Sequence, residues 1–187
     1  PDLMFVINSD WACFKDKLLP QKIRYKGLIQ TQATIRWMQM LANEEIVGNY
    51  IQTANLRKLI GYGFSDESAI GSVIAAKSCI PLPLDCIVRG YYVPQSPSWA
   101  QYKIDSTICG NHLPEGLKPY QQLSEPIYTP YSKKNGVNVT FEETVEILDD
   151  FLQNVFVLKE GSDSTKIAKA LATEVKKKSI SAYTFAY

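Results

Sequence analysis

A proline-stiffened stretch in the middle of the chain is the feature that most limits how this sequence can fold. Pro81 and Pro83 fix the backbone φ angle and donate no backbone hydrogen bond, so they suit a connector or a sheet edge rather than a central strand. The next residues, 85–88, include two β-branched side chains and predict a short buried strand. Arg89 is then expected to lie where this strand ends.

Arg89 is the first candidate binding residue. An arginine guanidinium offers a rigid fork of hydrogen-bond donors that fits the oxygens of a phosphate or a carboxylate. A surface salt bridge is the alternative role for a single arginine, and such exposed pairs contribute little to stability. The residue type alone leaves both roles open.

The composition is that of a globular protein without a strong charge preference. Of the 187 residues, 45% are hydrophobic and 21% are charged, and the formal net charge is +1. A nucleic-acid-binding domain is usually strongly basic, so the charge argues against that class. No apolar run has the length of a transmembrane helix, and the first residues do not resemble a signal peptide. We therefore expect a cytoplasmic protein with no nucleic-acid or membrane partner.

The four cysteines predict free thiols. Cys13, Cys79, Cys86 and Cys109 are widely scattered and form no C-x-x-C pair, and the sequence contains a single histidine. A structural zinc site needs closely spaced cysteine and histidine ligands, so none is expected. Buried, reduced thiols are the simplest prediction for all four.

Hydrophobic periodicity predicts an α+β fold. Apolar runs bounded by turn residues are typical of strands, and apolar residues three and four positions apart are typical of helices. In the first predicted helix, Trp37, Met38 and Met40 are expected to pack in the core. The predicted strands cover residues 3–7, 46–52 and 72–78, and the predicted helices cover residues 28–41, 141–154 and 164–182.

Capping signals mark the beginning of the last two helices. Thr140, with Glu143 three positions later, has the pattern of a capping box. Either Ser164 or Thr165 is expected to cap the final helix. The lysine run at 176–178 is expected near the C-terminal end of that helix, where cations are favoured.

Several motifs together resemble one enzyme family. The run from Pro81 to Tyr91 is similar to P-L-P-[LV]-E-[CV]-[IV]-V-R-G-Y, a pattern of the SAICAR synthetase (phosphoribosylaminoimidazole-succinocarboxamide synthase) family of purine biosynthesis. Further similar motifs lie on both sides, so the resemblance extends over nearly the whole chain. These motifs are Ser9-Asp10 through Asp16, Lys26-Gly27, Leu113–Lys118, Glu125–Pro130 with Lys133, and Phe141–Glu146.

The resemblance implies a two-lobed α+β fold. It places an N-terminal antiparallel-sheet lobe at residues 1–79 and an α/β substrate lobe at residues 80–187, with an ATP cleft between them. A connector between two lobes is a common place for a flat ligand to bind. The small-residue run before Pro81 is therefore expected to act as the hinge that holds adenine.

The resemblance also implies a reaction. Members of this family are carbon–nitrogen ligases that use ATP to activate the carboxylate of carboxyaminoimidazole ribonucleotide. The amine of L-aspartate then displaces phosphate, which gives SAICAR, ADP and phosphate. Phosphoryl transfer of this kind depends on positioning and on neutralisation of charge. The implied cofactors are ATP and Mg²⁺, and the implied partners are the two small-molecule substrates, with a homo-oligomer as a further candidate.

Matching the family's functional positions to this chain gives a set of candidate site residues. Arg89 is expected to clamp the anionic groups of the ribonucleotide, with serine hydroxyls assisting it. The resemblance assigns no metal ligand within this chain. The candidates are Asp16 and Lys26 for catalysis, Arg89, Ser96, Ser98 and Lys133 for substrate binding, and Lys77, Cys79 and Asp85 for cofactor binding.

The sequence also departs from the family pattern. Trp11 stands where the family has an arginine, and Lys15 and Tyr131 replace other motif residues. The resemblance expects a glycine-lysine phosphate loop before Pro1 and metal-binding carboxylates after Tyr187. Two interpretations stay open: a fragment of the enzyme, or a degenerate relative that binds nucleotide without turnover. A third is a generic α+β domain in which the arginine of the central motif has only a structural role.

Overall fold

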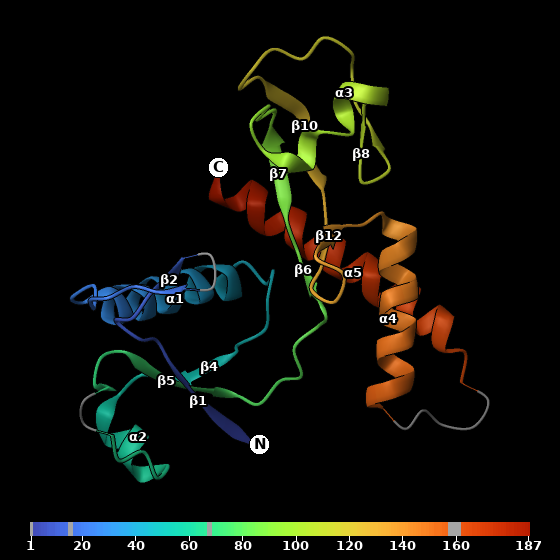
Figure 1. Cartoon of the computed structure of the whole chain (residues 1–187). Helices are drawn as coiled ribbons and strands as arrows, with labels where there is room; N and C mark the ends of the chain where they lie inside the picture. The colour runs from blue at the N-terminus through green and yellow to red at the C-terminus, as the bar shows by residue number, and fades with distance from the viewer. Residues whose placement is uncertain (1, 15–16, 67–68, 157–161) are drawn as a thin grey trace. The chain divides into compact units, whose positions relative to one another are not determined.

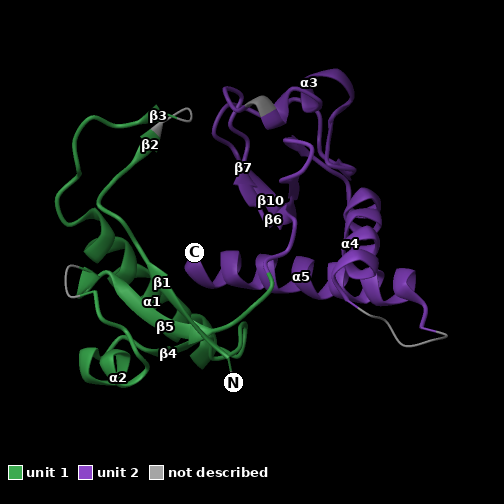
Figure 2. Ribbon diagram, turned by 60° about the horizontal axis from the view of Figure 1, so that its bottom comes forward, with its two compact units in different colours: residues 1–80 green, residues 81–187 purple. Residues whose placement is uncertain are grey.

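The proline-rich connector lies at the boundary between two compact parts of the protein. A computed structural model describes residues 2–14, 17–66, 69–156 and 162–187. The chain divides into unit 1, Pro1–Ile80, and unit 2, Pro81–Tyr187 (Figure 2). Both units contain strands and helices, so the predicted α+β class is confirmed.

An antiparallel sheet forms the centre of unit 1. Its strand order is β1-β5-β4, so β5 is the middle strand. The residues of β5 from Val73 to Ala76 are buried. The predicted strands at 3–7 and 72–78 are confirmed, whereas the strand predicted at 46–52 is shorter and begins only at Ile51. The strands of unit 1 are β1 (Leu3–Ile7), β2 (Cys13–Phe14), β3 (Lys17–Leu18), β4 (Ile51–Thr53) and β5 (Val73–Lys77).

Two helices complete unit 1. The predicted helix at 28–41 is confirmed as α1 (Lys26–Asn43), and α2 (Leu56–Gly61) begins after Asn55, whose side chain accepts a hydrogen bond from the Lys58 amide. Trp37 was expected in the core, but this is wrong, because 45% of its surface is exposed. The core lies instead between α2 and the sheet, and its buried members are Leu59, Phe64, Ala69, Val73 and Ala75.

The motif around Arg89 folds differently from the single strand that its sequence predicts. The run at 85–88 is divided between two strands, β6 (Leu84–Asp85) and β7 (Val88–Tyr91), which pair with different partners. Arg89 therefore lies inside β7 and not beyond a strand end, and its residue partner on β10 is Ile127. The pairing of each half was decided by segments more than thirty residues away in sequence.

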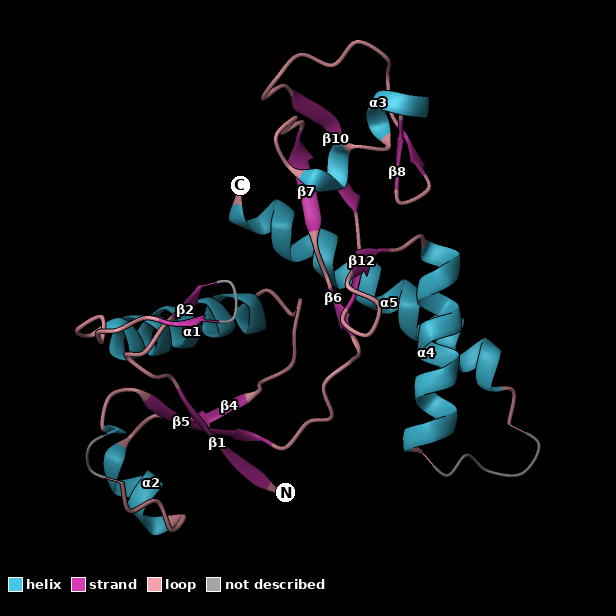
Figure 3. Ribbon diagram, in the orientation of Figure 1, coloured by secondary structure: helices cyan, strands magenta, loops and turns pink. Residues whose placement is uncertain are grey.

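The remaining short elements of unit 2 surround β7 (Figure 3). β10 pairs with β7, whereas β11 pairs with both β6 and β12. Tyr92, Trp99 and Tyr102 form a buried aromatic cluster beside these strands, with ring centroids 5.0 to 6.0 Å apart. These elements are η2 (Pro97–Trp99), α3 (Tyr102–Asp105), β8 (Thr107–Ile108), β9 (Asn111–His112), β10 (Gln122–Tyr128), β11 (Tyr131–Ser132) and β12 (Val137–Asn138).

Helices α4 (Phe141–Val155) and α5 (Ser164–Ala186) pack on each other in unit 2 (Figure 1). The predicted capping box is confirmed at the beginning of α4. Small alanines allow the two helices to approach closely, since Ala168 and Ala172 of α5 are fully buried against Leu148. This packing buries apolar surface that neither helix could bury alone.

Two predictions for α5 were wrong. The cap is Asp163, whose carboxylate accepts a hydrogen bond from the Lys166 amide at 3.0 Å, and not Ser164 or Thr165. The lysines at 176–178 lie in the middle of the helix, because α5 continues to Ala186. The helix packs on β7 and β10, and Tyr183, which lies beyond the lysine run, contacts Gly90 of β7.

The structure tests the predictions of free, buried thiols and of no membrane-spanning helix. All four thiols are free, but the prediction that they are buried was wrong: Cys13, Cys79 and Cys86 are exposed, and Cys109 is partly buried. The exposed cysteines lie in connectors and on short edge strands, where few neighbours cover them. Among the described residues, no helix combines the length and the apolar character needed to cross a membrane.

Replacement of Thr140 by alanine should weaken α4. The Thr140 hydroxyl accepts a hydrogen bond from the Glu143 amide, and the Glu143 carboxylate accepts one from the Thr140 amide. Loss of such a cap costs about 1 kcal/mol, which should be measured as a lower free energy of unfolding in urea. The matched control is Thr184→Ala at an exposed position of α5, where the change should stay within about 0.5 kcal/mol. Equal stability of the two variants would contradict the role of the cap.

Candidate functional site

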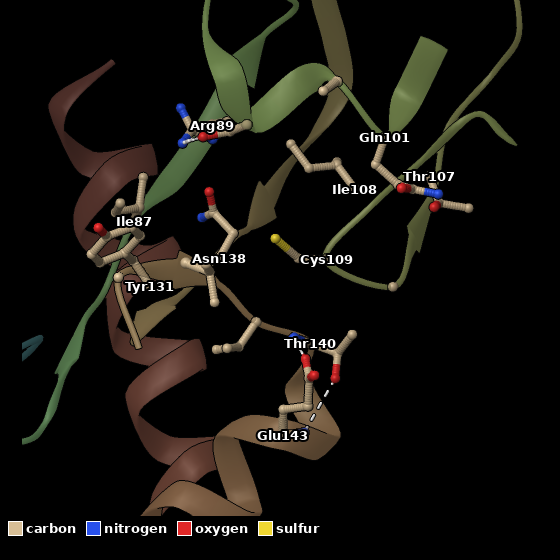
Figure 4. Close-up of a pocket in the computed structure, with 16 residues that line it drawn as sticks. Ile87, Arg89, Gln101, Thr107, Ile108, Cys109, Tyr131, Asn138, Thr140 and Glu143 are labelled. Carbon is tan, nitrogen blue, oxygen red and sulfur yellow. Dashed lines mark hydrogen bonds between the residues drawn. The ribbon is translucent and has the colours of Figure 1, made fainter. Parts of the chain in front are cut away.

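A cavity of about 980 Å³ lies in unit 2, and its lining includes two predicted site residues, Arg89 and Ser98, together with several unpredicted ones. It is bounded by β7, the η2 turn, the β8–β9 hairpin, β12 and the first turn of α4 (Figure 4). Because these segments are far apart in the sequence, only the tertiary fold brings their polar groups together. The polar lining residues include Arg89, Ser98, Gln101, Thr107, Asn138 and Glu143.

Arg89 and Ser98 form a direct pair at this cavity. An Nη2 hydrogen of Arg89 is donated to the Ser98 hydroxyl oxygen at 2.8 Å. The Nε atom of Arg89 is buried and has no hydrogen-bond partner among the described residues. A hydroxyl that accepts from a guanidinium keeps its own hydrogen free to donate. The pair can therefore present hydrogen-bond donors to an anionic ligand.

Burial shapes the electrostatics around Arg89. Partial desolvation lowers the pKa of the Arg89 guanidinium from its usual value, although a guanidinium stays protonated in proteins. Burial also raises the pKa of the Cys109 thiol to about 11, so this thiol is neutral at physiological pH. Figure 4 shows the Cys109 sulfur and the Asn138 amide directed into the same space. The cavity therefore has the Arg89 cation on one side, and its other lining groups include the neutral Cys109 and Asn138 and the acidic Glu143.

The other predicted substrate residues lie outside the lining of this cavity. The Ser96 carbonyl accepts a hydrogen bond from the Trp99 amide at 3.0 Å, which closes the turn that carries Ser98. The ammonium of Lys133 lies 3.3 Å from the carboxylate of Asp85, a predicted cofactor residue. The structure thus pairs Lys133 and Asp85 with each other across the β6–β11 ladder. Both side chains are about half exposed, so this ion pair adds little stability.

In unit 1, the Ser9-Asp10 and Lys26-Gly27 motifs lie together. The Lys26 ammonium donates hydrogen bonds to the Ser9 carbonyl at 2.9 Å and to the Gln30 side-chain oxygen at 3.0 Å. The Asp10 carboxylate accepts a hydrogen bond from the Gly27 amide at 2.8 Å, at the beginning of α1. Among the described residues these are the side-chain contacts of the Lys26 ammonium, which has a third N–H that can donate to a ligand.

Gly27 is required because α1 approaches the end of β1 very closely. A Cβ atom at this position would lie 2.2 Å from the Asn8 carbonyl oxygen, which is far inside contact distance. The Asn8 side chain also donates a hydrogen bond to the buried Thr31 hydroxyl at 2.9 Å. The glycine therefore allows the helix to sit directly on the strand end that carries Asp10.

Three candidates remain, Lys77, Cys79 and Asp16, and the two that the structure describes, Lys77 and Cys79, do not line the cavity. Lys77 is the last residue of β5, and its backbone amide donates to the Tyr50 carbonyl, while its side chain is exposed. Cys79 is exposed in the connector that follows. Asp16, a predicted catalytic residue, lies outside the described residues. Their assigned roles stay predictions.

Several lining residues were missed by the sequence analysis. Cys109 was expected only as a buried, reduced thiol, and Thr107 and Asn138 were assigned no role. A signal was present for the hairpin, because Gly110 and Asn111 form a turn directly after an apolar residue. No sequence signal marks Asn138, whose amide donates hydrogen bonds to the carbonyls of Thr129 and Pro130 and reaches the cavity through the β11–β12 pairing.

The described residues do not fit a magnesium site. Mg²⁺ prefers carboxylate and water oxygens in an octahedral arrangement. No group of three His, Cys, Asp or Glu side chains that could hold a metal ion occurs in the described ranges. Glu143, at the edge of the cavity, is committed to the α4 cap. The described part of this chain therefore does not by itself supply a metal centre.

Comparison with known protein families decides what kind of chain this is. A family model described as SAICAR synthetase matches residues 1–184. The chain belongs to the SAICAR synthetase family. It is 34% identical over 180 residues to a phosphoribosylaminoimidazole-succinocarboxamide synthase of Lachnospira eligens, and the match covers 94% of this chain and 58% of that protein. A second synthase, from Thermodesulfovibrio yellowstonii, is 35% identical over 156 residues, which cover 80% of this chain and 51% of that protein.

Solved structures of the family show the same fold. The SAICAR synthase of Saccharomyces cerevisiae complexed with SAICAR superposes with a TM-score of 0.73 at 21% identity, and the match covers 97% of this chain and 55% of that one. The SAICAR synthetase of Pyrococcus horikoshii gives a TM-score of 0.52 at 14% identity, over 93% of this chain and 62% of that one. This member of the SAICAR synthetase family thus spans about half the length of the relatives that it matches.

Cys109 should be the slowest of the four thiols to react with an alkylating reagent. Only the thiolate is nucleophilic, and with a pKa of about 11 the Cys109 thiolate is about one part in a thousand at pH 8. The exposed Cys13, Cys79 and Cys86 should be carbamidomethylated by iodoacetamide first, as peptide mass spectrometry would measure. Raising the pH to 10 should increase the Cys109 thiolate fraction and bring its alkylation rate closer to that of the other three thiols. Modification of Cys109 ahead of the other three at pH 8 would contradict the burial described.

Proposed function

We propose that this chain carries part of the SAICAR synthetase reaction, in which ATP drives the joining of L-aspartate to carboxyaminoimidazole ribonucleotide. Membership of the family over residues 1–184 supports the reaction class. The Arg89–Ser98 pair at the unit 2 cavity is the observation that supports the substrate. Its chemistry suits the negatively charged phosphate and carboxylate groups of a ribonucleotide.

The binding step follows from the properties of the paired side chains. Arg89 stays charged while it is partly removed from water, and a charge-assisted hydrogen bond is stronger in such surroundings than in bulk solvent. Its Nε–H, which has no partner among the described residues, is available to a second ligand oxygen. Ser98 would fix the plane of the guanidinium and add one O–H donor. Together these groups orient an anionic substrate before reaction.

The other proposed roles rest on the family resemblance. Lys26 would neutralise charge near the phosphate or the aspartate, together with Asp16, and Lys77, Cys79 and Asp85 would contact ATP. When ATP is bound, it supplies the phosphoryl group that activates the substrate carboxylate. The two-lobed arrangement with an ATP cleft, the requirement for Mg²⁺ and the cytoplasmic location stay predictions.

A second candidate function is nucleotide binding without turnover. It is favoured by the departures from the family pattern at Trp11, Lys15 and Tyr131. Incubation with ATP, Mg²⁺, carboxyaminoimidazole ribonucleotide and L-aspartate separates the two. Formation of SAICAR by this chain supports catalysis, whereas calorimetric binding of ATP without product supports the second candidate. If the longest natural form of the protein also made no SAICAR, the enzyme assignment would be wrong.

Replacement of Arg89 by lysine should weaken binding of carboxyaminoimidazole ribonucleotide. Lysine keeps the charge but loses the fork of donors, so we expect a loss of about 1–3 kcal/mol in isothermal titration calorimetry. Arg36→Lys, at an exposed position of α1, is the matched control and should leave the affinity unchanged. Unchanged affinity in the Arg89 variant would instead favour the interpretation in which this arginine is only structural.

A further inference from the structure

We infer that Tyr183 of α5 is a positioning residue for Arg89, because its ring fills the space beside Gly90 and so fixes the strand that carries the arginine. This inference rests on the proposed function, in which Arg89 binds the anionic substrate. Tyr183 does not line the cavity, so it would act through the position of β7 and not by touching the ligand.

The contact between Tyr183 and Gly90 leaves no room for a side chain. A Cβ atom built on Gly90 would lie 2.1 Å from the Tyr183 hydroxyl oxygen, 2.8 Å from its Cζ and 3.0 Å from its Cε1. Gly90 is buried within β7, and its φ angle is not in the left-handed region that favours glycine. Close approach of the tyrosine ring, and not a turn, is therefore the reason for glycine at this position.

The geometry of a strand links this contact to Arg89. Successive residues of a strand point to opposite faces, so the face of Gly90 that Tyr183 covers is opposite to the face from which Arg89 extends. Arg89 is also held by its register with Ile127 of β10. Figure 1 shows the red C-terminal part of α5 beside β7, in agreement with the packing of α5 on both β7 and β10. One face of β7 therefore packs on α5, and Arg89 extends from the other face toward the cavity.

Tyr183 is itself held by a second aromatic ring. Its ring stacks on Tyr187 with centroids 4.7 Å apart and an interplanar angle of 27°. Tyr187 also contacts Tyr91, the residue after Gly90, at a centroid distance of 6.1 Å. Tyr183 and Tyr187 therefore contact two consecutive residues of β7, Gly90 and Tyr91.

A shift of β7 would separate the Arg89–Ser98 pair. Ser98 lies on η2 and not on the strand, and the hydrogen bond between the two side chains is 2.8 Å long. A methyl group at Gly90 would force the Tyr183 side chain, the helix or the strand to shift, because the three nearest atoms all belong to the Tyr183 ring and hydroxyl. A misplacement of about 1 Å can cost about 10²-fold in reaction rate, and binding contacts that depend on the same geometry should weaken as well.

Binding measurements on the full 187-residue chain test the inference, with carboxyaminoimidazole ribonucleotide as the probe. We expect Gly90→Ala to weaken binding about tenfold, and Tyr183→Ala to weaken it several-fold. Tyr183→Phe keeps the ring but loses the hydroxyl that contacts Gly90, so it should weaken binding less than Tyr183→Ala does. The double variant Gly90→Ala/Tyr183→Ala removes the clash and should bind more tightly than Gly90→Ala alone. Gly48→Ala is the matched control, because a Cβ there meets no atom within 4 Å.

A second measurement does not depend on ligand binding. Hydrogen exchange of the Arg89 Nε–H, assigned in NMR spectra by its loss in Arg89→Lys, reports whether the guanidinium is held in place. Exchange should be faster in Gly90→Ala and in Tyr183→Ala than in the parent or in Tyr183→Phe, with melting curves confirming that each variant is folded. Equal exchange in all folded variants would overturn the inference. If the parent protected this proton but did not bind the ribonucleotide, the proposed function would fail while the positioning role held.

Discussion

The packing of α5 on the β7 backbone is the constraint on which the cavity of unit 2 depends. Gly90 offers bare backbone to Tyr183 on one face of the strand, and Arg89 extends from the other face toward Ser98. The helix is anchored at its other end by the alanines that it buries against α4. Helix α5 thus packs in the apolar core at one end and contacts the strand that carries Arg89 at the other.

A glycine at a close contact between two elements also follows a cationic residue in unit 1. There a cation, Lys26, is followed by Gly27, and an added Cβ at that glycine would meet the Asn8 carbonyl oxygen at 2.2 Å. In both units the backbone of a glycine next to a cationic residue is in close contact with another segment. The contact is with the Tyr183 side chain at Gly90 and with the Asn8 carbonyl at Gly27. Close backbone contact reduces the freedom of the neighbouring cation, and this lowers the entropy that ordering it around a ligand would cost.

Local signals in the sequence were sufficient for the elements that are stabilised locally. The α4 cap follows from Thr140 and Glu143, whose reciprocal hydrogen bonds span three residues. The family resemblance identified Arg89 and Ser98, which the structure brings together, but it also assigned separate roles to Lys133 and Asp85, which form an ion pair with each other. Which residues share a cavity depends on strand pairing between distant segments, and no local pattern encodes that pairing.

By itself, the sequence determined the α+β class, the positions of α1, α4 and two strands of the unit 1 sheet, β1 and β5, and the family to which the chain belongs. These properties depend on periodicity, on capping and on motif residues that lie next to one another. Only the tertiary structure decided that Arg89 lies within a strand, that Cys109 and Asn138 share its cavity, and that Tyr183 explains Gly90. Such contacts join residues up to about ninety positions apart, so their geometry exists only once the helices and strands have packed.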